Sequence, residues 1–495
     1  MSVKPQYETY RYTDELVTLN SQSMVECRLS GSEIGSILAV QATATPTECV
    51  CVDGEVRYKG KTLLCIVYED GDGKLCRVER GLEFFHKAEG KEVTPACFAK
   101  MAFEIVSVTH RREGSGLYVT VVVNAKSNVY GSKQIEYLIG GEELTVRESE
   151  FTVCKTVCVS GETEGEDEFE TEYVGDILLH SENAVVTRMQ ATGGQIDIEG
   201  EITLGVCALK SDDSVCTYEK TVPFTMQIPC EEAFGKVTGG ARVQVKSANL
   251  SAGVDEERGV SKMLFSYTLL ADCYLSRTES LTAVDDAFCV FRETETSQAF
   301  GEGRYVVKQD KHVERISGNA TFSTPLETEY ALETSVLPRA ELVCKKTERG
   351  IEVEGAVLAE VFARNADGAR KSRTLSLPFV FPLDVDGDEI EADCSVCGLN
   401  VRRRSGGEIE AEAILKLSLR LYGKQKWSYV QECKVGEEKP VCNSAVSVFM
   451  TKEGESLWEV AKRLSKTPKE LQESNPDLSF PVSAGQRIFV YRQVK

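Results

Sequence analysis

Several residue types that usually mark catalysis are scarce in this sequence. Only four histidines and two tryptophans occur among 495 residues. The histidines, at positions 86, 110, 180 and 312, are scattered, so they form no spacing typical of a metal site or of a Cys–His nucleophile pair. The phosphate-binding pattern G-x-x-x-x-G-K-[ST] does not occur either. We therefore expect no enzyme activity, no metal ion and no cofactor.

Basic residues are too few to balance the acidic ones. Lys and Arg number 57 against 78 Asp and Glu, which gives a formal net charge of -21 at pH 7. Residues 444–495 contain 8 basic and 6 acidic residues, so this segment carries +2 and the remainder carries -23. An acidic chain of this kind repels phosphate backbones and anionic lipid headgroups, and we expect no nucleic-acid partner.

Long apolar stretches are also missing. No run approaches the ~20 apolar residues that a transmembrane helix requires, and the first seven residues lack the apolar core of a secretory signal. We therefore expect a protein without a transmembrane segment that stays in the cytoplasm.

The 18 cysteines are spread thinly through strand-like segments. In a reducing compartment we expect them to be mostly buried thiols rather than disulfides.

What the sequence does contain is a compact pattern near its C-terminal end. Residues 446–450 alternate as a short strand with one buried face does. Ser456 and Thr467 each begin a capping box, which is a start signal for a helix. Apolar residues at i, i+3, i+4 and i+7 follow the first signal, and Pro468 stands at the first position of the second helix. Alternation returns at 488–490, so the segment predicts a strand, two short helices and a closing strand.

The residues before about 440 show almost no helical periodicity. They form short runs rich in Val, Thr, Ile and Tyr that are separated by Gly and Asp turns, which is typical of antiparallel β domains. One landmark occurs three times, a glycine between an acidic-flanked strand and an apolar strand, at Gly54, Gly200 and Gly355. The same series of elements follows each glycine: an apolar strand, an acidic turn, a strand ending in Phe and a pair of longer strands. We therefore predict three copies of one β unit.

The spacing of these landmarks gives the predicted boundaries. A Pro-Phe pair begins 23 residues after the glycine in the second and third copies, whereas the first copy is longer and lacks the proline. Polar linkers are expected at 292–303 and 436–445. The predicted fold class is mainly β, with tandem antiparallel β domains in single file and a small βααβ domain after them. The predicted domains are 12–148, 152–292, 303–436 and 446–492.

The C-terminal pattern resembles the LysM domain. The match covers about a tenth of the chain. The sequence departs from the LysM pattern at Glu455, where Asp is commoner, and its closing strand lacks the usual Pro. The matching positions are Gly454, Ser456, Leu457, Trp458, Ala461, Asn475, Gly485 and Ile488.

The repeated units resemble the SPOCS domain of endospore-forming bacteria. This resemblance rests on the order of a V-x-G-x-V strand, a hairpin, a P-F strand and two closing strands. SPOCS repeats followed by a LysM domain are the arrangement of spore-coat morphogenetic proteins. The resemblance implies a non-catalytic assembly protein in the mother-cell cytoplasm at the forespore surface and in the spore coat. Such a protein tethers the coat basement layer by binding its morphogenetic ATPase and other coat proteins.

Two other functions remain open. One is a cell-wall protein that binds a peptidoglycan- or chitin-type glycan, and the other is a wall hydrolase with an unrecognised catalytic unit. The glycan-binding function needs an export route, for which the first residues give no signal.

The LysM resemblance also implies a binding site. LysM domains bind N-acetylated sugars in a shallow groove between the first turn and the loop after the second helix. Because peptidoglycan is absent from the mother-cell cytosol, we expect this groove to take a protein segment, with an N-acetylated glycan as the alternative ligand. The residues expected at the groove are Gly454, Glu455, Ser456, Leu457, Trp458, Asn475, Pro476, Asp477 and Leu478.

Two short patterns that resemble metal or redox motifs are interpreted as structural. Cys394 and Cys397 have C-x-x-C spacing, but no second pair lies at zinc-ribbon distance, so we expect two strand thiols near a turn. Residues 384–388 resemble a calcium loop. However, Glu389 occupies the position where an EF-hand requires Gly, so we expect a solvated turn.

Overall fold

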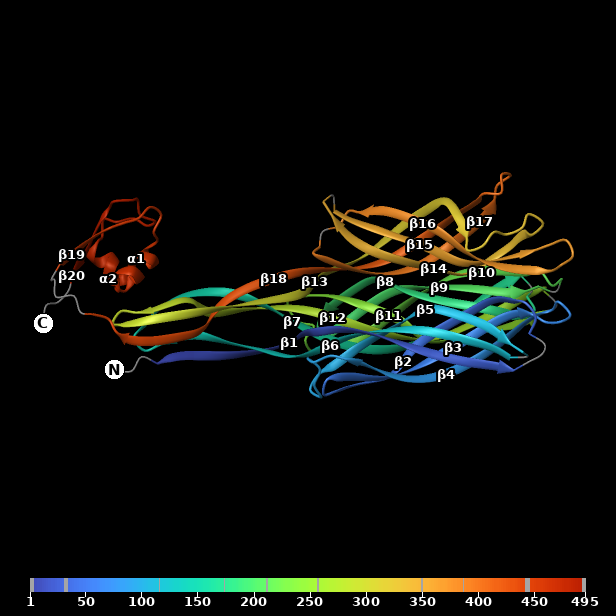
Figure 1. Ribbon diagram of the computed structural model, residues 1–495, viewed down its shortest axis with the longest axis horizontal. Helices are drawn as coiled ribbons and strands as arrows, with labels where there is room; N and C mark the ends of the chain where they lie inside the picture. The colour runs from blue at the N-terminus through green and yellow to red at the C-terminus, as the bar shows by residue number, and fades with distance from the viewer. Residues whose placement is uncertain are drawn as a thin grey trace.

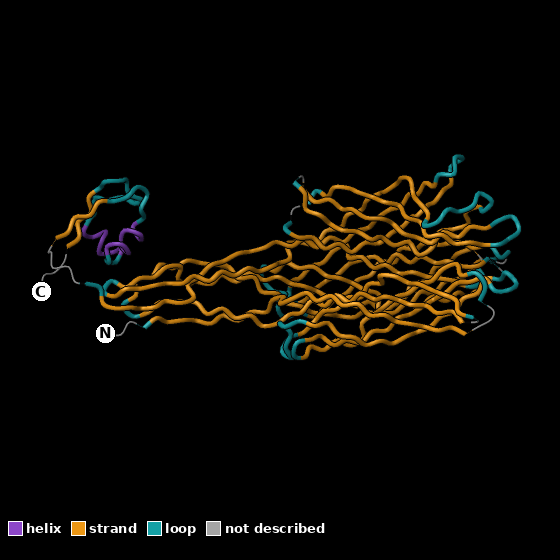
Figure 2. Tube along the Cα trace, in the orientation of Figure 1, coloured by secondary structure: helices purple, strands orange, loops and turns teal. Residues whose placement is uncertain are grey.

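The computed structural model describes residues 4–30, 34–114, 116–172, 174–210, 212–255, 258–348, 350–385, 387–440 and 446–491. Within these residues the chain forms 20 strands and two short helices, and its strand pairs are antiparallel. The predicted mainly β class is therefore confirmed. A wide body, a long narrow stalk and a small C-terminal module follow one another along the molecule (Figure 1; Figure 2).

Eighteen of the described strands fall into three consecutive sets with one topology. In each set the first, sixth and fifth strands form one three-stranded sheet, and the second, third and fourth strands form another. In the third set the two sheets join through a short pairing of β13 with β16. The first set contains β1 (Pro5–Ser30), β2 (Ile37–Val52), β3 (Glu55–Glu69), β4 (Leu75–Glu89), β5 (Phe98–Glu113) and β6 (Gly116–Gly141). The second contains β7 (Leu144–Glu172), β8 (Ile177–Thr192), β9 (Gln195–Leu209), β10 (Val215–Pro229), β11 (Val237–Asp255) and β12 (Val260–Cys289). The third contains β13 (Arg292–Phe322), β14 (Ala331–Thr347), β15 (Gly350–Arg364), β16 (Arg370–Leu383), β17 (Glu389–Arg403) and β18 (Ile409–Glu438).

A glycine paired with a phenylalanine marks the same place in each set. A Cβ atom on Gly200 would lie 2.2 Å from the ring of its partner Phe224, so the ring occupies the space that a side chain would need. The first landmark is therefore Gly60 and not Gly54, which lies in the turn between β2 and β3 with a φ of +78°. Each phenylalanine follows its glycine by 24 residues, so the expectation that the first copy is longer was wrong. The register pairs are Gly60 with Phe84, Gly200 with Phe224 and Gly355 with Phe379.

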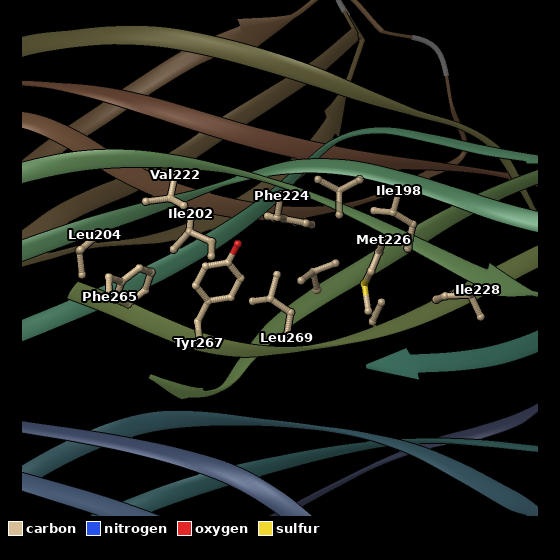
Figure 3. Packing of buried hydrophobic residues seen from close by; sticks show 14 of the residues in the cluster. Ile198, Ile202, Leu204, Val222, Phe224, Met226, Ile228, Phe265, Tyr267 and Leu269 are labelled. Atoms are coloured by element: carbon tan, nitrogen blue, oxygen red, sulfur yellow. The ribbon is translucent and has the colours of Figure 1, made fainter. Parts of the chain in front are cut away.

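The three sets lie side by side in the body and not in single file (Figure 1). Each set has an apolar interior of its own, such as the packing of Ile202, Phe224 and Leu269 inside the second set (Figure 3). A further apolar cluster lies where the sets meet, and its side chains are buried because all three sets pack together there. This shared cluster includes Leu38 and Val67 from the first set, Leu178 and Leu209 from the second, and Val336 and Phe362 from the third.

The stalk consists of the ends of the longest strand pairs, β1 with β6, β7 with β12 and β13 with β18 (Figure 1). The linker predicted at 292–303 is part of β13, and the boundary predicted near 148–153 lies inside β7. Both expectations were wrong because alternating polar residues on a ribbon with a solvent face look like linker composition. Aromatic side chains from all three ribbons fill the stalk interior, including Tyr12, Tyr137, Phe151, Trp427 and Tyr429.

Buried charges connect the sets where the stalk enters the body. Arg420 is 3% exposed and donates hydrogen bonds to Asp393 of its own set and to the carbonyl of Ala241 in the second set. Burial raises the pKa of Glu391, but Arg420 and its other cationic neighbours lower it to about 2. Paired charges of this kind fix the relative position of the sets, because an unpaired buried charge is strongly unfavourable. Ion pairs between sets include Lys100–Asp272 (3.3 Å), Arg242–Asp393 (3.4 Å) and Lys126–Glu391 (3.5 Å).

The predicted acidic hairpin turns are confirmed. Gly73 N donates to Asp70 O at 3.2 Å, and Gly368 N donates to Asn365 O at 3.1 Å. In both turns the first side chain also accepts a backbone hydrogen bond, as short polar residues do at turns.

The thiols and the calcium-like loop have ordinary structural surroundings. Cys154 and Cys273 are buried free thiols, and burial raises their pKa to about 11 and about 12. Cys394 and Cys397 both lie on β17, and Cys397 Sγ donates to the carbonyl of Ile414 at 3.5 Å. Burial raises the pKa of Cys394 to about 12, which is unlike a redox-active thiol. In the calcium-like loop Asp386 lies outside the described residues. Asp388 there accepts the backbone N–H of Lys424 at 2.9 Å.

Neither α1 (Leu457–Leu464) nor α2 (Pro468–Ser474), the helices of the described residues, is long and apolar enough to span a membrane.

Candidate functional site

The C-terminal module has the predicted order of elements. They are β19 (Val446–Met450), α1 (Leu457–Leu464), α2 (Pro468–Ser474) and β20 (Arg487–Tyr491). Both predicted capping boxes are present. In the first, Ser456 Oγ accepts the N–H of Glu459 at 3.3 Å, and the Glu459 carboxylate accepts the N–H of Ser456 at 2.8 Å. The backbone N–H and the hydroxyl of Ser456 both donate to the Glu459 carboxylate and lower its pKa, and the capping box satisfies backbone groups at the start of α1.

The two helices cover one face of the two-stranded β19–β20 sheet. Because the module is so small, its stability depends on a few large side chains that are almost fully buried. The buried side chains of this core are Val460, Ala461, Leu464, Leu471, Ile488 and Val490.

The first turn of the expected groove is held by backbone hydrogen bonds to the loop before β20. Gly454 adopts a φ of +78° and donates to Val482 O at 2.9 Å, and Val482 N donates to Glu455 O at 3.0 Å. The Glu455 carboxylate accepts from Arg463 at 2.8 Å, so it is engaged within the module. This loop is therefore preorganised by its own contacts.

The second side of the expected groove has both exposed and buried residues. Leu457 and Leu478 are half-buried and pack against the module core, whereas Pro476 and Asp477 are exposed. Asn475 is buried, and its side chain joins the end of α2 to β20. Its Nδ2 donates to Leu471 O (3.0 Å) and Phe489 O (2.8 Å), and its Oδ1 accepts from Phe489 N (2.7 Å). Asn475 thus has a structural role in this structure.

Trp458 belongs to a contact between the module and the stalk. It is 9% exposed, and its ring meets the ring of Phe288 on β12 edge-to-face, with centroids 5.1 Å apart. Its Nε1 donates to Asp286 Oδ2 at 2.7 Å. The other oxygen of Asp286 accepts from Lys462 Nζ at 2.6 Å. Sequence analysis placed Trp458 at the groove, but the stalk already covers it.

Further polar contacts strengthen the same junction. Lys439, which precedes the module, donates to Cys289 O and to Ser465 Oγ, both at 2.9 Å. The guanidinium of Arg147 lies 5.5 Å from the Trp458 ring centroid. Burial raises the pKa of Asp286, but the hydrogen bonds from Lys462 and Trp458 outweigh it and lower the pKa below the ordinary value. The carboxylate therefore stays charged and holds the module on the stalk.

Sequence reasoning missed Asp286 and Phe288 as partners of the module. They lie about 170 residues before Trp458, on β12. No spacing in the sequence links the two segments.

Comparison of the chain with protein-family models, with curated proteins and with solved structures gave no match.

Proposed function

We propose that this protein is a non-catalytic assembly protein of the spore coat that tethers the coat basement layer to the forespore by capturing another protein with its C-terminal module. The partners are the morphogenetic ATPase of that layer and other coat proteins, and the place is the mother-cell side of the forespore surface. The proposal rests on the SPOCS-like repeats and the LysM-like pattern of Gly454, Ser456, Leu457 and Trp458.

The observation that carries the proposal is the position of the module. It lies at the free end of the stalk, away from the body, and Asp286 with Phe288 fixes its orientation there (Figure 1). A recognition domain on a rigid arm presents its surface at a distance from a bulky, acidic body. Preorganisation of this kind lowers the entropy lost on binding.

The expected contact includes the groove residues Leu457 and Leu478. Replacing Leu478 by Glu places a charge where an apolar partner group would bind. We expect capture of the purified ATPase by the full chain to weaken by about 2 kcal/mol or more, as for an interface anchor. Leu264→Glu is the matched control, since Leu264 is also a solvent-accessible leucine but lies on β12, outside the module. Unchanged Trp458 fluorescence would show that the variant module still folds and docks.

Glycan binding by the same groove is the second candidate, and the LysM-like pattern favours it equally. Titration of the full chain with chitin oligomers distinguishes the two ligands. Tight chitin binding without capture of the ATPase would replace the proposed function by a cell-wall one. Recovery of the protein from vegetative wall rather than from mother-cell and coat fractions would have the same consequence.

A further inference from the structure

Within the described residues, no segment covers the outer, apolar face of the two-stranded β19–β20 sheet. Val446, Val448 and Met450 on β19 and Phe489 and Tyr491 on β20 are between 39% and 55% exposed. Val446 is the register partner of Tyr491 and Val448 that of Phe489, so these side chains form one continuous patch. The helices cover the opposite face of this sheet, which holds Ile488 and Val490. Contiguous apolar patches on a protein surface usually mark an interaction site.

The stalk does not cover this face. The module docks through α1 and the residue after it, by way of Trp458, Lys462 and Ser465. Docking therefore fixes the module with its β19–β20 sheet on the side that faces away from the stalk (Figure 1; Figure 2). The patch is presented at the end of the molecule, where a large partner can reach it without meeting the body.

The charges beside the patch indicate the chemistry of its partner. Lys452 follows β19 and Arg487 begins β20, and both side chains are exposed. The nearby Glu453 is engaged, because its carboxylate accepts the N–H of Ala484 at 2.6 Å, and Glu455 pairs with Arg463 at 2.8 Å. Glu453 keeps its negative charge, but Lys452 and Arg487 outnumber it, so the summed charge at this end of the patch is positive. This charge matches a segment that carries carboxylates beside its apolar residues.

We infer that the β19–β20 face is the docking surface for an acidic amphipathic segment of the captured protein, whose apolar side chains cover Val448 and Phe489 and whose carboxylates meet Lys452 and Arg487. This inference rests on the proposed function and identifies a second surface on the same module, separate from the groove. A lipid surface fits less well, because the adjoining hairpin of the stalk carries the exposed Glu142 together with Glu143. These carboxylates repel anionic headgroups.

The test compares variants of the full chain for binding to the purified morphogenetic ATPase. Val448→Glu combined with Phe489→Glu places two charges in the patch, and we expect affinity to fall tenfold or more. Val380→Glu is the matched control, since Val380 is also an exposed valine on a strand but lies in the body, on β16. Trp458 fluorescence checks that every variant keeps its module folded and docked.

The outcomes separate this inference from the proposed function. Loss of binding in the patch variant with no change in the Val380 control supports both. Unchanged binding in the patch variant together with loss in Leu478→Glu overturns the inference and leaves protein capture by the module intact. Binding that survives both variants overturns both.

A charge test decides the character of the partner. We expect Lys452→Glu with Arg487→Glu to weaken binding several-fold and to reduce its dependence on salt. Stronger binding in this variant would overturn an acidic partner. Sedimentation of the wild-type chain, but not of the patch variant, with phosphatidylglycerol vesicles would assign the patch to a membrane and overturn the inference.

Discussion

At the scale of single residues, Arg370 shows how one side chain joins the three sets of strands. Its side chain is 2% exposed and donates to Glu333 in its own set at 2.9 Å and to the carbonyl of Asp213 in the second set. It also lies 3.7 Å from Glu69 in the first set. Burial raises the pKa of Glu69, and the Arg370 guanidinium opposes this rise.

We expect Arg370→Ala to destabilise the protein by about 3–5 kcal/mol, because it leaves buried carboxylates without their partner. Chemical denaturation of the full chain measures this change in the free energy of unfolding. Arg315→Ala is the control, since that side chain is 74% exposed in its pair with Glu412 and should contribute less than about 1 kcal/mol. Equal effects of the two substitutions would contradict a joining role for Arg370.

The docking of the module should depend on pH through Asp286. Because its pKa is lowered in the folded state, the stabilisation is complete above the ordinary Asp pKa of about 3.9 and is lost as pH falls through the lowered value. We expect Trp458 to stay buried at pH 5 and to become exposed only as pH falls through the lowered pKa of Asp286, which its fluorescence emission reports. Asp286→Asn should expose Trp458 at neutral pH and remove the dependence. An acid transition that persists in this variant would show that another group controls docking.

At the scale of elements, the glycine and phenylalanine pairs explain why one pattern occurs in each set. Gly355 approaches the carbonyl of Glu341 on the neighbouring strand, and a Cβ there would lie only 2.1 Å from that oxygen. The absence of a side chain lets the strands come together, and the phenylalanine ring covers the exposed backbone. The pair therefore serves strand packing.

We expect Gly200→Ala and Gly355→Ala each to reduce stability by about 1–3 kcal/mol, because the added methyl group overpacks the interior. Gly71→Ala is the control, as its Cβ would meet no atom within 4 Å. Thermal unfolding of the three variants distinguishes them. A Gly200 variant as stable as the Gly71 variant would show that Phe224 moves aside without loss.

At the scale of the whole molecule, the repeated sets behave as one body. The apolar cluster in the body and the aromatic interior of the stalk both draw residues from all three sets. An isolated set would expose its share of these clusters to water. Leu178, Leu179 and Leu209 would become exposed in a second set taken alone, and the lost burial is about 1.5–3 kcal/mol for each such side chain.

We therefore expect the three sets of the full chain to unfold in a single transition and a fragment of residues 144–289 to lack cooperative unfolding. Calorimetry of both samples tests this expectation. A fragment that melts cooperatively near the temperature of the full chain would show that the sets are independent. In that case, deleting one set at a time would show which set binds which partner. If the sets share one interior, substitutions in the intact chain are the better way to map the partners.

The sequence alone determined the features that depend on neighbours along the chain. Alternation predicts the strands, and the Asp and Asn turns predict the hairpins, because both depend on local backbone geometry. The capping boxes at Ser456 and Thr467 also depend on local geometry, since each of their hydrogen bonds spans three residues. The order of elements in the module follows from these boxes.

Only the tertiary structure decided how distant segments meet. The side-by-side arrangement depends on contacts such as Arg370 with Asp213, which no periodicity encodes. The polar strands of the stalk look like linkers until three ribbons share one interior. Trp458 contacts the stalk instead of the groove for the same reason. Burial of its large apolar ring is favourable, and a complementary surface on the stalk lies next to it. In this chain that surface is Phe288 and Asp286, on the stalk.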